Sequence, residues 1–256
     1  MKKLLNFEFR KLVRQKSFYV CNIILLGLIF LSALMSKAIF DNIENVENVE
    51  QTLPTASNML QSSLTGGNLP LIIGIFVALF TCEDYTDGII KNIYAKGYSR
   101  IEVYFSKLIA VCIFSAVACL VSIVVSFASG LVLFDIGSGM DAHAVLVLAT
   151  QVFVIVFGYT TMFFTISTIL KKTGGSIAGC IVAPMVVSLV FGMADSFLHN
   201  NNIKFANYWL DGIFESIAKA PSDVTRSTLI SAVVISAAYA IVCIAIGIKT
   251  SKRQEI

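Results

Sequence analysis

The chain has 256 residues, of which 57% are hydrophobic and only 14% are charged, and its formal net charge is +3. About a quarter of the residues are charged in ordinary soluble domains, so a soluble domain of this length could not bury so much apolar surface. The apolar residues also form long uninterrupted runs, which are typical of membrane spans. We therefore expect an integral membrane protein and exclude a soluble domain.

The N-terminal residues 1–17 are predicted to form an amphipathic helix at the membrane surface. Its apolar face would consist of Met1, Leu5, Phe9 and Leu12. The basic residues broadly opposite are Lys3, Arg10, Lys11 and Arg14. Because the apolar run that follows is as long as a span, we expect the N-terminus to be retained rather than cleaved as a signal peptide.

Six apolar runs can each reach the roughly twenty residues that a helix needs to cross the hydrocarbon core. They are predicted over residues 18–36, 69–81, 108–133, 144–170, 174–192 and 227–248. The second run needs part of residues 59–65 to reach full length. The predicted fold class is an all-α polytopic membrane protein with six transmembrane helices in a single domain over 1–256.

The distribution of charge predicts the orientation. Fifteen of the nineteen Lys and Arg residues lie on the side that holds both termini, whereas ten of the sixteen carboxylates lie on the other side. Loops rich in Lys and Arg stay in the cytoplasm, so both termini are predicted to be cytoplasmic. The acidic outer loop over 41–58 is expected to be solvated.

Several kinds of site are missing from the sequence. No Asp, Glu, Lys or Arg falls within the core of a predicted span, which disfavours an ion-coupled carrier. His143 and His199 lie far apart, and no metalloprotease or serine-hydrolase motif is present, so neither a catalytic nor a metal site is predicted. The six cysteines show no metal-ligand spacing and are expected to be reduced. No P-loop occurs, so any ATP must be hydrolysed by another chain.

The cytoplasmic segment 84–107 has the pattern of two capped helices. Acidic residues from Glu83 to Asp87 place negative charge at the start of the first helix. Its apolar face would consist of Ile89, Ile90, Ile93 and Tyr94. Gly97 can take the left-handed cap conformation, and Ser99 and Glu102 have the spacing of a capping box that opens the third span. Such an element can transmit a push from a cytoplasmic partner, or it can lie on lipid headgroups.

The residues of this segment also match a family pattern, in which an acidic-aromatic pair precedes x-x-G-T-I-K-N and then G-x-S-R. The matching positions are Asp84, Tyr85, Gly88, Ile90, Lys91, Asn92, Gly97, Ser99 and Arg100. In this pattern the segment resembles the loop of type-2 permeases of the ATP-binding-cassette superfamily, including bacterial peptide-export and bacteriocin-immunity subunits. The chain departs from the pattern at Ile89, where Thr is common.

The resemblance implies a membrane subunit without its own ATPase site in a bacterial cell membrane. It implies two copies of a P-loop ATPase that bind ATP and Mg, a second permease and no nucleic acid. The residues expected to contact the ATPase are Asp84, Tyr85, Asp87, Gly88, Lys91, Asn92, Tyr94, Gly97, Ser99 and Arg100. A homodimer is the simplest assembly, with a sibling permease as the main alternative. By family analogy, the exported substrate would be an amphipathic or antimicrobial peptide, with lipids or drugs as alternatives.

Two other classes of function remain open at this point. One is a non-transporting sensor or assembly partner, for which the coupling segment would be dispensable. The other is an ion-coupled secondary transporter, which would depend on an ion gradient.

The outer segment 193–226 has apolar residues at helical intervals, namely Trp209, Ile213 and Ile217, with Phe214 beside them. We predict a short helix that dips back toward the membrane, with Trp209 at the interface. By the resemblance, this re-entrant helix would close the outer end, with Trp209 and Phe214 as gate residues.

Small residues at helical spacing predict close packing of three spans. These residues are Ser115, Cys119, Ser122, Ser126 and Ser129 in span three, Gly175, Gly179 and Ala183 in span five, and Ala232, Ser236 and Ala240 in span six. Span four carries Gln151, Thr161 and Thr165 on roughly one side, as a possible translocation path, although packing is the favoured explanation. Pro184 predicts a kink in span five.

Overall fold

The computed structural model describes residues 2–43, 68–133, 142–198, 208–217 and 224–253. Within these ranges, six helices are long and apolar enough to cross a membrane. They are Lys16–Ile39, Asn68–Thr86, Arg100–Leu133, His143–Leu170, Thr173–Phe197 and Arg226–Lys252. The described residues contain no strand, so the predicted all-α membrane class is confirmed.

The helices follow one another in a simple order. In the first part of the chain they are α1 (Lys2–Arg14), α2 (Lys16–Ile43), α4 (Asn68–Thr86), α5 (Ile89–Ala95) and α6 (Arg100–Leu133). The fourth span is continuous but has three parts, α7 (Ala142–Phe153), the π-helical η1 (Val154–Tyr159) and α8 (Thr160–Leu170). After it come α9 (Thr173–Leu198), α10 (Leu210–Ile217) and α11 (Arg226–Arg253).

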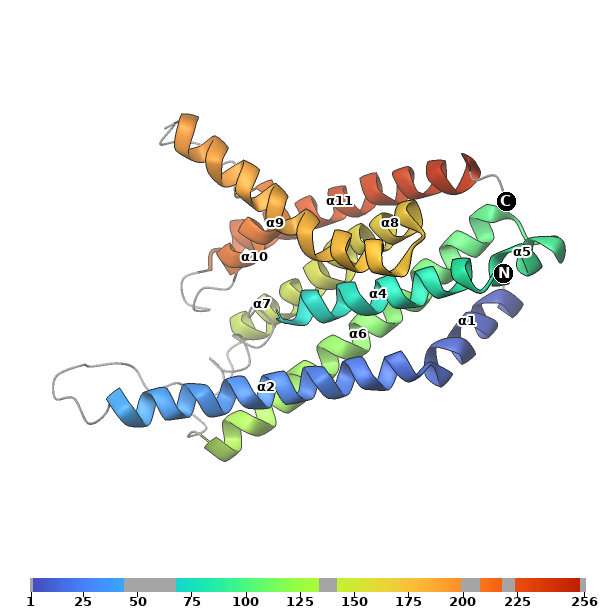
Figure 1. The fold of residues 1–256 in the computed structure, drawn as a ribbon. Helices are drawn as coiled ribbons and strands as arrows, with labels where there is room; N and C mark the ends of the chain where they lie inside the picture. The colour runs from blue at the N-terminus through green and yellow to red at the C-terminus, as the bar shows by residue number, and fades with distance from the viewer. Residues whose placement is uncertain (1, 44–67, 134–141, 199–207, 218–223, 254–256) are drawn as a thin grey trace.

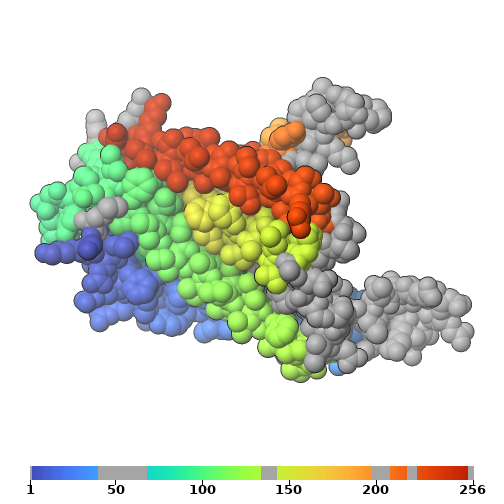
Figure 2. Space-filling model, turned by 180° about the vertical axis from the view of Figure 1, so that it is seen from behind, coloured from blue at the N-terminus to red at the C-terminus, as the bar shows by residue number. Residues whose placement is uncertain are grey.

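The spans form one bundle with two distinct ends. Both chain termini and α5 lie at one end, and α10 lies at the other (Figure 1). Seen from behind, α6 runs between the first two helices, α1 and α2, on one side and α11 on the other (Figure 2). The outer part of α9 leaves the bundle, and the helix changes direction along its course (Figure 1). Pro184 lies inside α9, in agreement with the predicted kink.

Burial differs sharply between two of the spans. In α4, 67% of the most apolar stretch is buried inside the chain, whereas in α9 the share is 6%. The core around α4 contains Phe76 and Phe114, whose stacked ring centroids lie 3.5 Å apart. The second span therefore lies inside the bundle, and the fifth presents most of its surface outward.

The second span ends later than predicted. The apolar run ends near Thr81, but α4 continues to Thr86 and includes Glu83 and Asp84. These two carboxylates contact basic side chains, which allows the helix to continue past the apolar run. Residues 59–65, predicted to complete this span, lie outside the described residues, as does the acidic loop beyond residue 43. Glu83 and Asp84 lie in the last turn of α4, after the apolar run, so they do not contradict the prediction that the core of each span lacks charge.

The buried face of α1 also differs from the predicted one. The side chains that face the bundle are Leu4, Glu8 and Leu12. Phe9, which was predicted on the apolar face, is 47% exposed. Leu12 is the only predicted member of that face that is fully buried among the described residues of α1. The helix is rotated because Glu8 finds a cationic partner inside the bundle.

The small-residue faces agree with the prediction in two spans out of three. All five Ser and Cys side chains of the face in α6 are buried, as are Ala232, Ser236 and Ala240 in α11. In α9, Gly175 is exposed and Gly179 and Ala183 are half-buried, so this face is not fully packed within the chain. The side chains that α9 buries near its start are Ser176 and Cys180.

Candidate functional site

Two glycines shape the segment that holds α5. Gly88 precedes the helix with a φ of +66°, and Gly97 follows it with a φ of +84°. Side chains disfavour these left-handed conformations, so glycine allows a tight corner at each end of the helix. Next, Ser99 and Glu102 each accept a hydrogen bond from the backbone N–H of the other, both at 3.2 Å. The predicted glycine cap and capping box are confirmed.

The apolar face of α5 packs within the chain. Ile90 and Ile93 are buried, and Ile93 packs with Leu4 of α1 and Val103 of α6. This packing argues against the hypothesis that the face lies on lipid headgroups. Arg100 links the start of α6 to the C-terminal helix α11, because its Nη1 donates a hydrogen bond to the carbonyl oxygen of Lys252 at 2.9 Å.

Much of the polar surface predicted to contact an ATPase is open. The exposed residues of the predicted set are Asp87, Lys91, Asn92, Gly97 and Ser99. Those that are half-buried are Tyr85, Gly88, Tyr94 and Arg100. Asp84 is fully buried, so its side chain has no surface to offer a soluble partner, and its predicted role as a contact is wrong.

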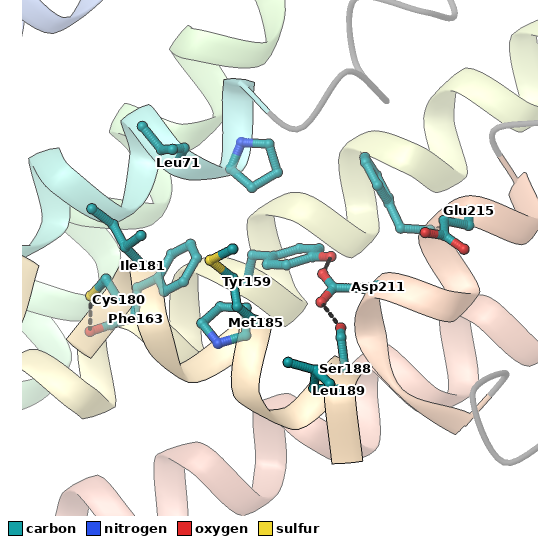
Figure 3. Close-up of a pocket in the computed structure, with 13 residues that line it drawn as sticks. Leu71, Tyr159, Phe163, Cys180, Ile181, Met185, Ser188, Leu189, Asp211 and Glu215 are labelled. Atoms are coloured by element: carbon teal, nitrogen blue, oxygen red, sulfur yellow. Dashed lines mark hydrogen bonds between the residues drawn. The ribbon is translucent and has the colours of Figure 1, made fainter. Parts of the chain in front are cut away.

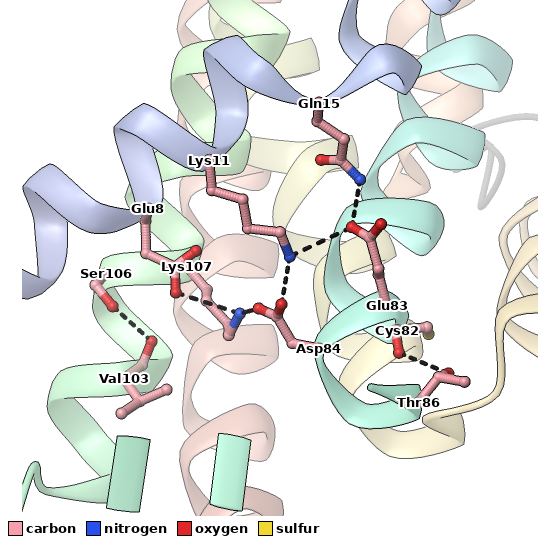
Figure 4. A network of polar contacts seen from close by, with 10 residues as sticks. All are labelled: Glu8, Lys11, Gln15, Cys82, Glu83, Asp84, Thr86, Val103, Ser106 and Lys107. Atoms are coloured by element: carbon pink, nitrogen blue, oxygen red, sulfur yellow. Dashed lines mark hydrogen bonds and ion pairs between the residues drawn. The ribbon is translucent and has the colours of Figure 1, made fainter. Parts of the chain in front are cut away.

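Asp84 instead lies at the centre of a charged cluster, shown in Figure 4, which we call the inner cluster. It consists of Glu8, Lys11, Gln15, Glu83, Asp84 and Lys107. Lys11 of α1 and Lys107 of α6 both contact Asp84 of α4. Lys107 also lies 3.3 Å from Glu8, and Lys11 lies 3.4 Å from Glu83. Three helices are therefore joined by ion pairs at the end where both termini lie.

Sequence reasoning missed the inner cluster because its members lie far apart in the chain. Lys107 was assigned to the helical cytoplasmic segment 84–107, where its contacts with α1 and α4 could not be foreseen. Glu8 is spaced by four residues from both Leu4 and Leu12, and this shared helical face is the one signal that could have indicated its burial.

At the end of the bundle opposite to the termini, α10 confirms the predicted short helix between the fifth and sixth spans, and its placement on the outer side stays a prediction. Its side chains Ile213, Phe214 and Ile217 are buried, and so is Trp209 just before it. Trp209 stacks on Phe191 of α9, with ring centroids 6.1 Å apart, and meets Tyr239 of α11 edge-on at 5.5 Å. The helix is therefore held between α9 and α11. A role as a gate stays a prediction.

The residues suggested as a translocation path in span four make helix-to-helix contacts. Gln151 is buried, and its Nε2 donates to the carbonyl oxygen of Ile217 at 3.0 Å. Thr165 donates to the carbonyl oxygen of Thr161 at 2.8 Å and lies 3.1 Å from that of Cys243 in α11. Thr161 alone among the three borders a recess, an apolar one between α6 and α11 of about 340 Å³.

Asp211 is the main polar feature of α10 (Figure 3). One carboxylate oxygen accepts a hydrogen bond from the Tyr159 hydroxyl. The other accepts from the Ser188 hydroxyl at 2.5 Å and from Trp209 Nε1 at 2.9 Å. Three neutral donors from η1, α9 and the start of α10 thus converge on one carboxylate. Apart from the helical pattern of α10, no signal in the sequence pointed to this site.

This carboxylate borders a groove of about 660 Å³, which we call the outer groove. It lies between α4, the fourth span, α9 and α10. Its walls are mostly apolar and include Leu71, Phe163, Ile181, Met185 and Leu189. Asp211 and Glu215 lie along one side of it (Figure 3). The structure therefore has a short helix with an exposed polar face at one end, and toward the other end a groove lined by apolar side chains and two carboxylates.

The comparison with known families agrees with this architecture. The sequence profile of the family described as ABC-2 family transporter protein matches residues 4–195 of the 256, which include five of the six spans. No curated protein matches the chain. The match covers most of the chain, and the six apolar helices are those of a multi-pass membrane protein. The chain belongs to the ABC-2 family of transporter proteins.

Proposed function

We propose that the chain is the membrane subunit of an exporter that is driven by ATP hydrolysed on a separate P-loop ATPase. Permeases of the ABC-2 family generally work with an ATPase subunit. The observation that carries the proposal is the geometry of α5, a short helix with its apolar face packed against α1 and α6 and its polar face exposed. A partner that binds α5 can displace a rigid part of the membrane domain.

The connection from α5 into the membrane supports this proposal. After the corner at Gly97, α6 runs without a break from Arg100 to Leu133. A helix of this length spans about 50 Å. ATP-driven movement at α5 would therefore tilt α6 and the helices that pack against it.

The charge distribution supports cytoplasmic termini and a cytoplasmic α5. Basic residues are concentrated at the end where both termini lie, including Lys91 and Lys96 on α5 and Lys171 and Lys172 between α8 and α9. The positive-inside rule places this end in the cytoplasm, where an ATPase can reach it.

A second permease would complete the path, and a second copy of this chain is the simplest candidate. Of the six spans in the described residues, α9 is the least buried, and its exposed residues outside the outer groove include Val182, Val186 and Val190. Gly179 is already packed against Ile166 and Leu170 of α8, whereas Gly174 and Gly175 have open space beside them and would let a second helix approach closely. Both features support α9 as the contact between two copies.

Co-purification tests the proposed docking. The chain would be expressed with the ATPase from the neighbouring reading frame and purified in mild detergent. We compare wild type with Lys91→Glu/Lys96→Glu, which reverses two exposed charges on α5. The matched control is Lys249→Glu, an exposed lysine near the same end on α11. We expect the double variant to retain about a tenth or less of the ATPase, because like charges in an interface are strongly unfavourable.

Two outcomes count against the proposal. If the ATPase never co-purifies with the wild type, the exporter hypothesis is wrong. If the ATPase binds the wild type and both variants equally, α5 is not its docking site. If the ATPase is lost equally from the α5 variant and the α11 control, the effect comes from charge in general, and α5 is not the specific contact.

A further inference from the structure

The carboxylate of Asp211 is half-buried and is held by residues from the middle of two spans, although α10 lies at the end of the bundle. Its partner Tyr159 lies near the middle of the span His143–Leu170, and its partner Ser188 lies near the middle of Thr173–Phe197. An ionisable group at this depth is costly and usually has a function.

Asp211 has hydrogen bonds but no counter-charge within the described parts of the chain. Its donors are a phenol, a hydroxyl and an indole, all neutral. The ion pairs found within the described residues join Lys11 and Lys107 to carboxylates at the other end of the bundle. The three donors hold both carboxylate oxygens in place and leave the negative charge uncompensated there.

The outer groove has the dimensions and the lining of a ligand site. Its volume of about 660 Å³ falls in the usual range for drug-sized ligands. Apolar side chains from α4, α8 and α9, such as Leu71, Phe163 and Met185, form most of its walls. Glu215, which is exposed, adds a second carboxylate one helical turn after Asp211. A ligand that complements this groove has an apolar body and a positive group.

We propose that the outer groove binds an amphipathic cation, with the positive group of the ligand at Asp211 and its apolar body between α4 and α9. Glu215 attracts the cation toward the groove, and Asp211 holds it. This inference rests on the proposed function, since an exporter supplies the reason for such a cargo site. It narrows the cargo to molecules with a positive charge, which excludes anionic lipids and neutral drugs as preferred substrates.

Direct binding tests the proposal. The purified chain is placed in nanodiscs of neutral lipid without ATPase or nucleotide. The probes are an arylalkyl trimethylammonium and its neutral tert-butyl isostere, which have the same shape and differ in charge. Nanodiscs without protein correct for partition into lipid. We expect wild type to bind the cation about tenfold or more tightly than the isostere, because a close opposite charge in a poorly solvated groove is strongly favourable.

Variants assign the charge preference to one side chain. Asp211→Asn is expected to reduce the preference to about twofold or less and to leave the affinity for the neutral isostere unchanged. Asp195→Asn removes a carboxylate of α9 that is not among the groove residues and is expected to keep the full preference. Leu189→Trp adds bulk to a groove wall and is expected to weaken the binding of both probes. This variant tests the location even if Asp211→Asn does not fold.

Equal affinity of wild type for the two probes would overturn the proposal, as would a full charge preference in Asp211→Asn. Unchanged binding of both probes to Leu189→Trp would show that they bind elsewhere and would also overturn it. None of these results depends on the ATPase. A negative binding result together with normal co-purification therefore rejects the cation site alone, and failed co-purification rejects the exporter hypothesis.

Discussion

The molecule contains two groups of inward-facing carboxylates, and they differ in their partners. In the inner cluster, Asp84 is contacted by two lysines from two other helices. In the outer groove, Asp211 accepts three hydrogen bonds from neutral groups, and no cation pairs with it in the described residues. The negative charge of Asp84 is compensated by two lysines of the same chain, whereas the negative charge of Asp211 is available to a ligand.

This difference indicates different roles. A buried ion pair whose members come from separate helices fixes the positions of those helices, and removing one member leaves an uncompensated charge. A carboxylate held only by neutral donors joins its helices through hydrogen bonds, and its negative charge is available to a ligand. The inner cluster is thus structural, and Asp211 is the better candidate for binding.

The largest expected effect follows from Lys107→Met. It removes one of the two cations beside Asp84 and the one beside Glu8, both of which are fully buried. We expect a loss of about 3–5 kcal/mol in the free energy of unfolding, because a buried charge is left without its partner. Unfolding in a titration with SDS measures it. The double variant Glu8→Gln/Lys107→Met keeps the net charge of the cluster and should recover part of the lost stability. If Lys107→Met alone causes no loss of stability, the cluster is not structural.

A smaller effect is expected for Tyr159→Phe in the outer groove. The change removes one donor to Asp211 and keeps the ring, which lies 5.8 Å from the ring of Phe214. We expect a loss of about 1.5–3 kcal/mol, the usual range for a hydrogen bond to a charged group. The same SDS titration measures it. In a chain that already carries Asp211→Asn, Tyr159→Phe should cost less free energy than it does in the wild type. Equal losses in the two backgrounds would argue against the hydrogen bond.

Gln15→Ala tests the solvent-exposed edge of the inner cluster. Gln15 donates to Glu83 at 2.7 Å, and the Glu83 side chain is 44% exposed. Water can replace the lost donor at such a site, so we expect a loss of about 0.5–1.5 kcal/mol. Thermal unfolding in mild detergent measures the change. A loss as large as that of Lys107→Met would mean that Glu83 depends on the cluster as strongly as Asp84 does.

Asp211→Asn should have the smallest effect on stability and gives the sharpest comparison. Removing the uncompensated charge lowers the cost of desolvation. The amide oxygen of Asn can accept from Ser188 and Trp209, and its NH2 group can donate to the Tyr159 hydroxyl, which can act as an acceptor. We expect the free energy of unfolding to change by about 1 kcal/mol or less. The same substitution at Asp84 should destabilise strongly, because two lysines would lose a buried anion. Equal losses at both positions would remove the distinction between the two carboxylates.

Local patterns in the sequence were sufficient for much of the fold. The six spans, the cap at Gly97 and the Ser99–Glu102 capping box were predicted because each depends on residues that are near one another in the chain. The short helix at Leu210–Ile217 was likewise predicted from its spacing of apolar residues. The buried face of α1 was predicted incorrectly, because amphipathicity favoured Phe9 and could not reveal the partner of Glu8.

The sequence by itself determined a six-span helical membrane protein with a capped helix between its second and third spans, because hydrophobic run length and capping residues act over a few turns of helix. The tertiary structure alone decided which charges are paired. Lys11 and Asp84 are separated by 73 positions, and Tyr159 and Asp211 by 52. The compensation of a buried charge depends on which helices are neighbours in space, and helical periodicity carries no information about that arrangement.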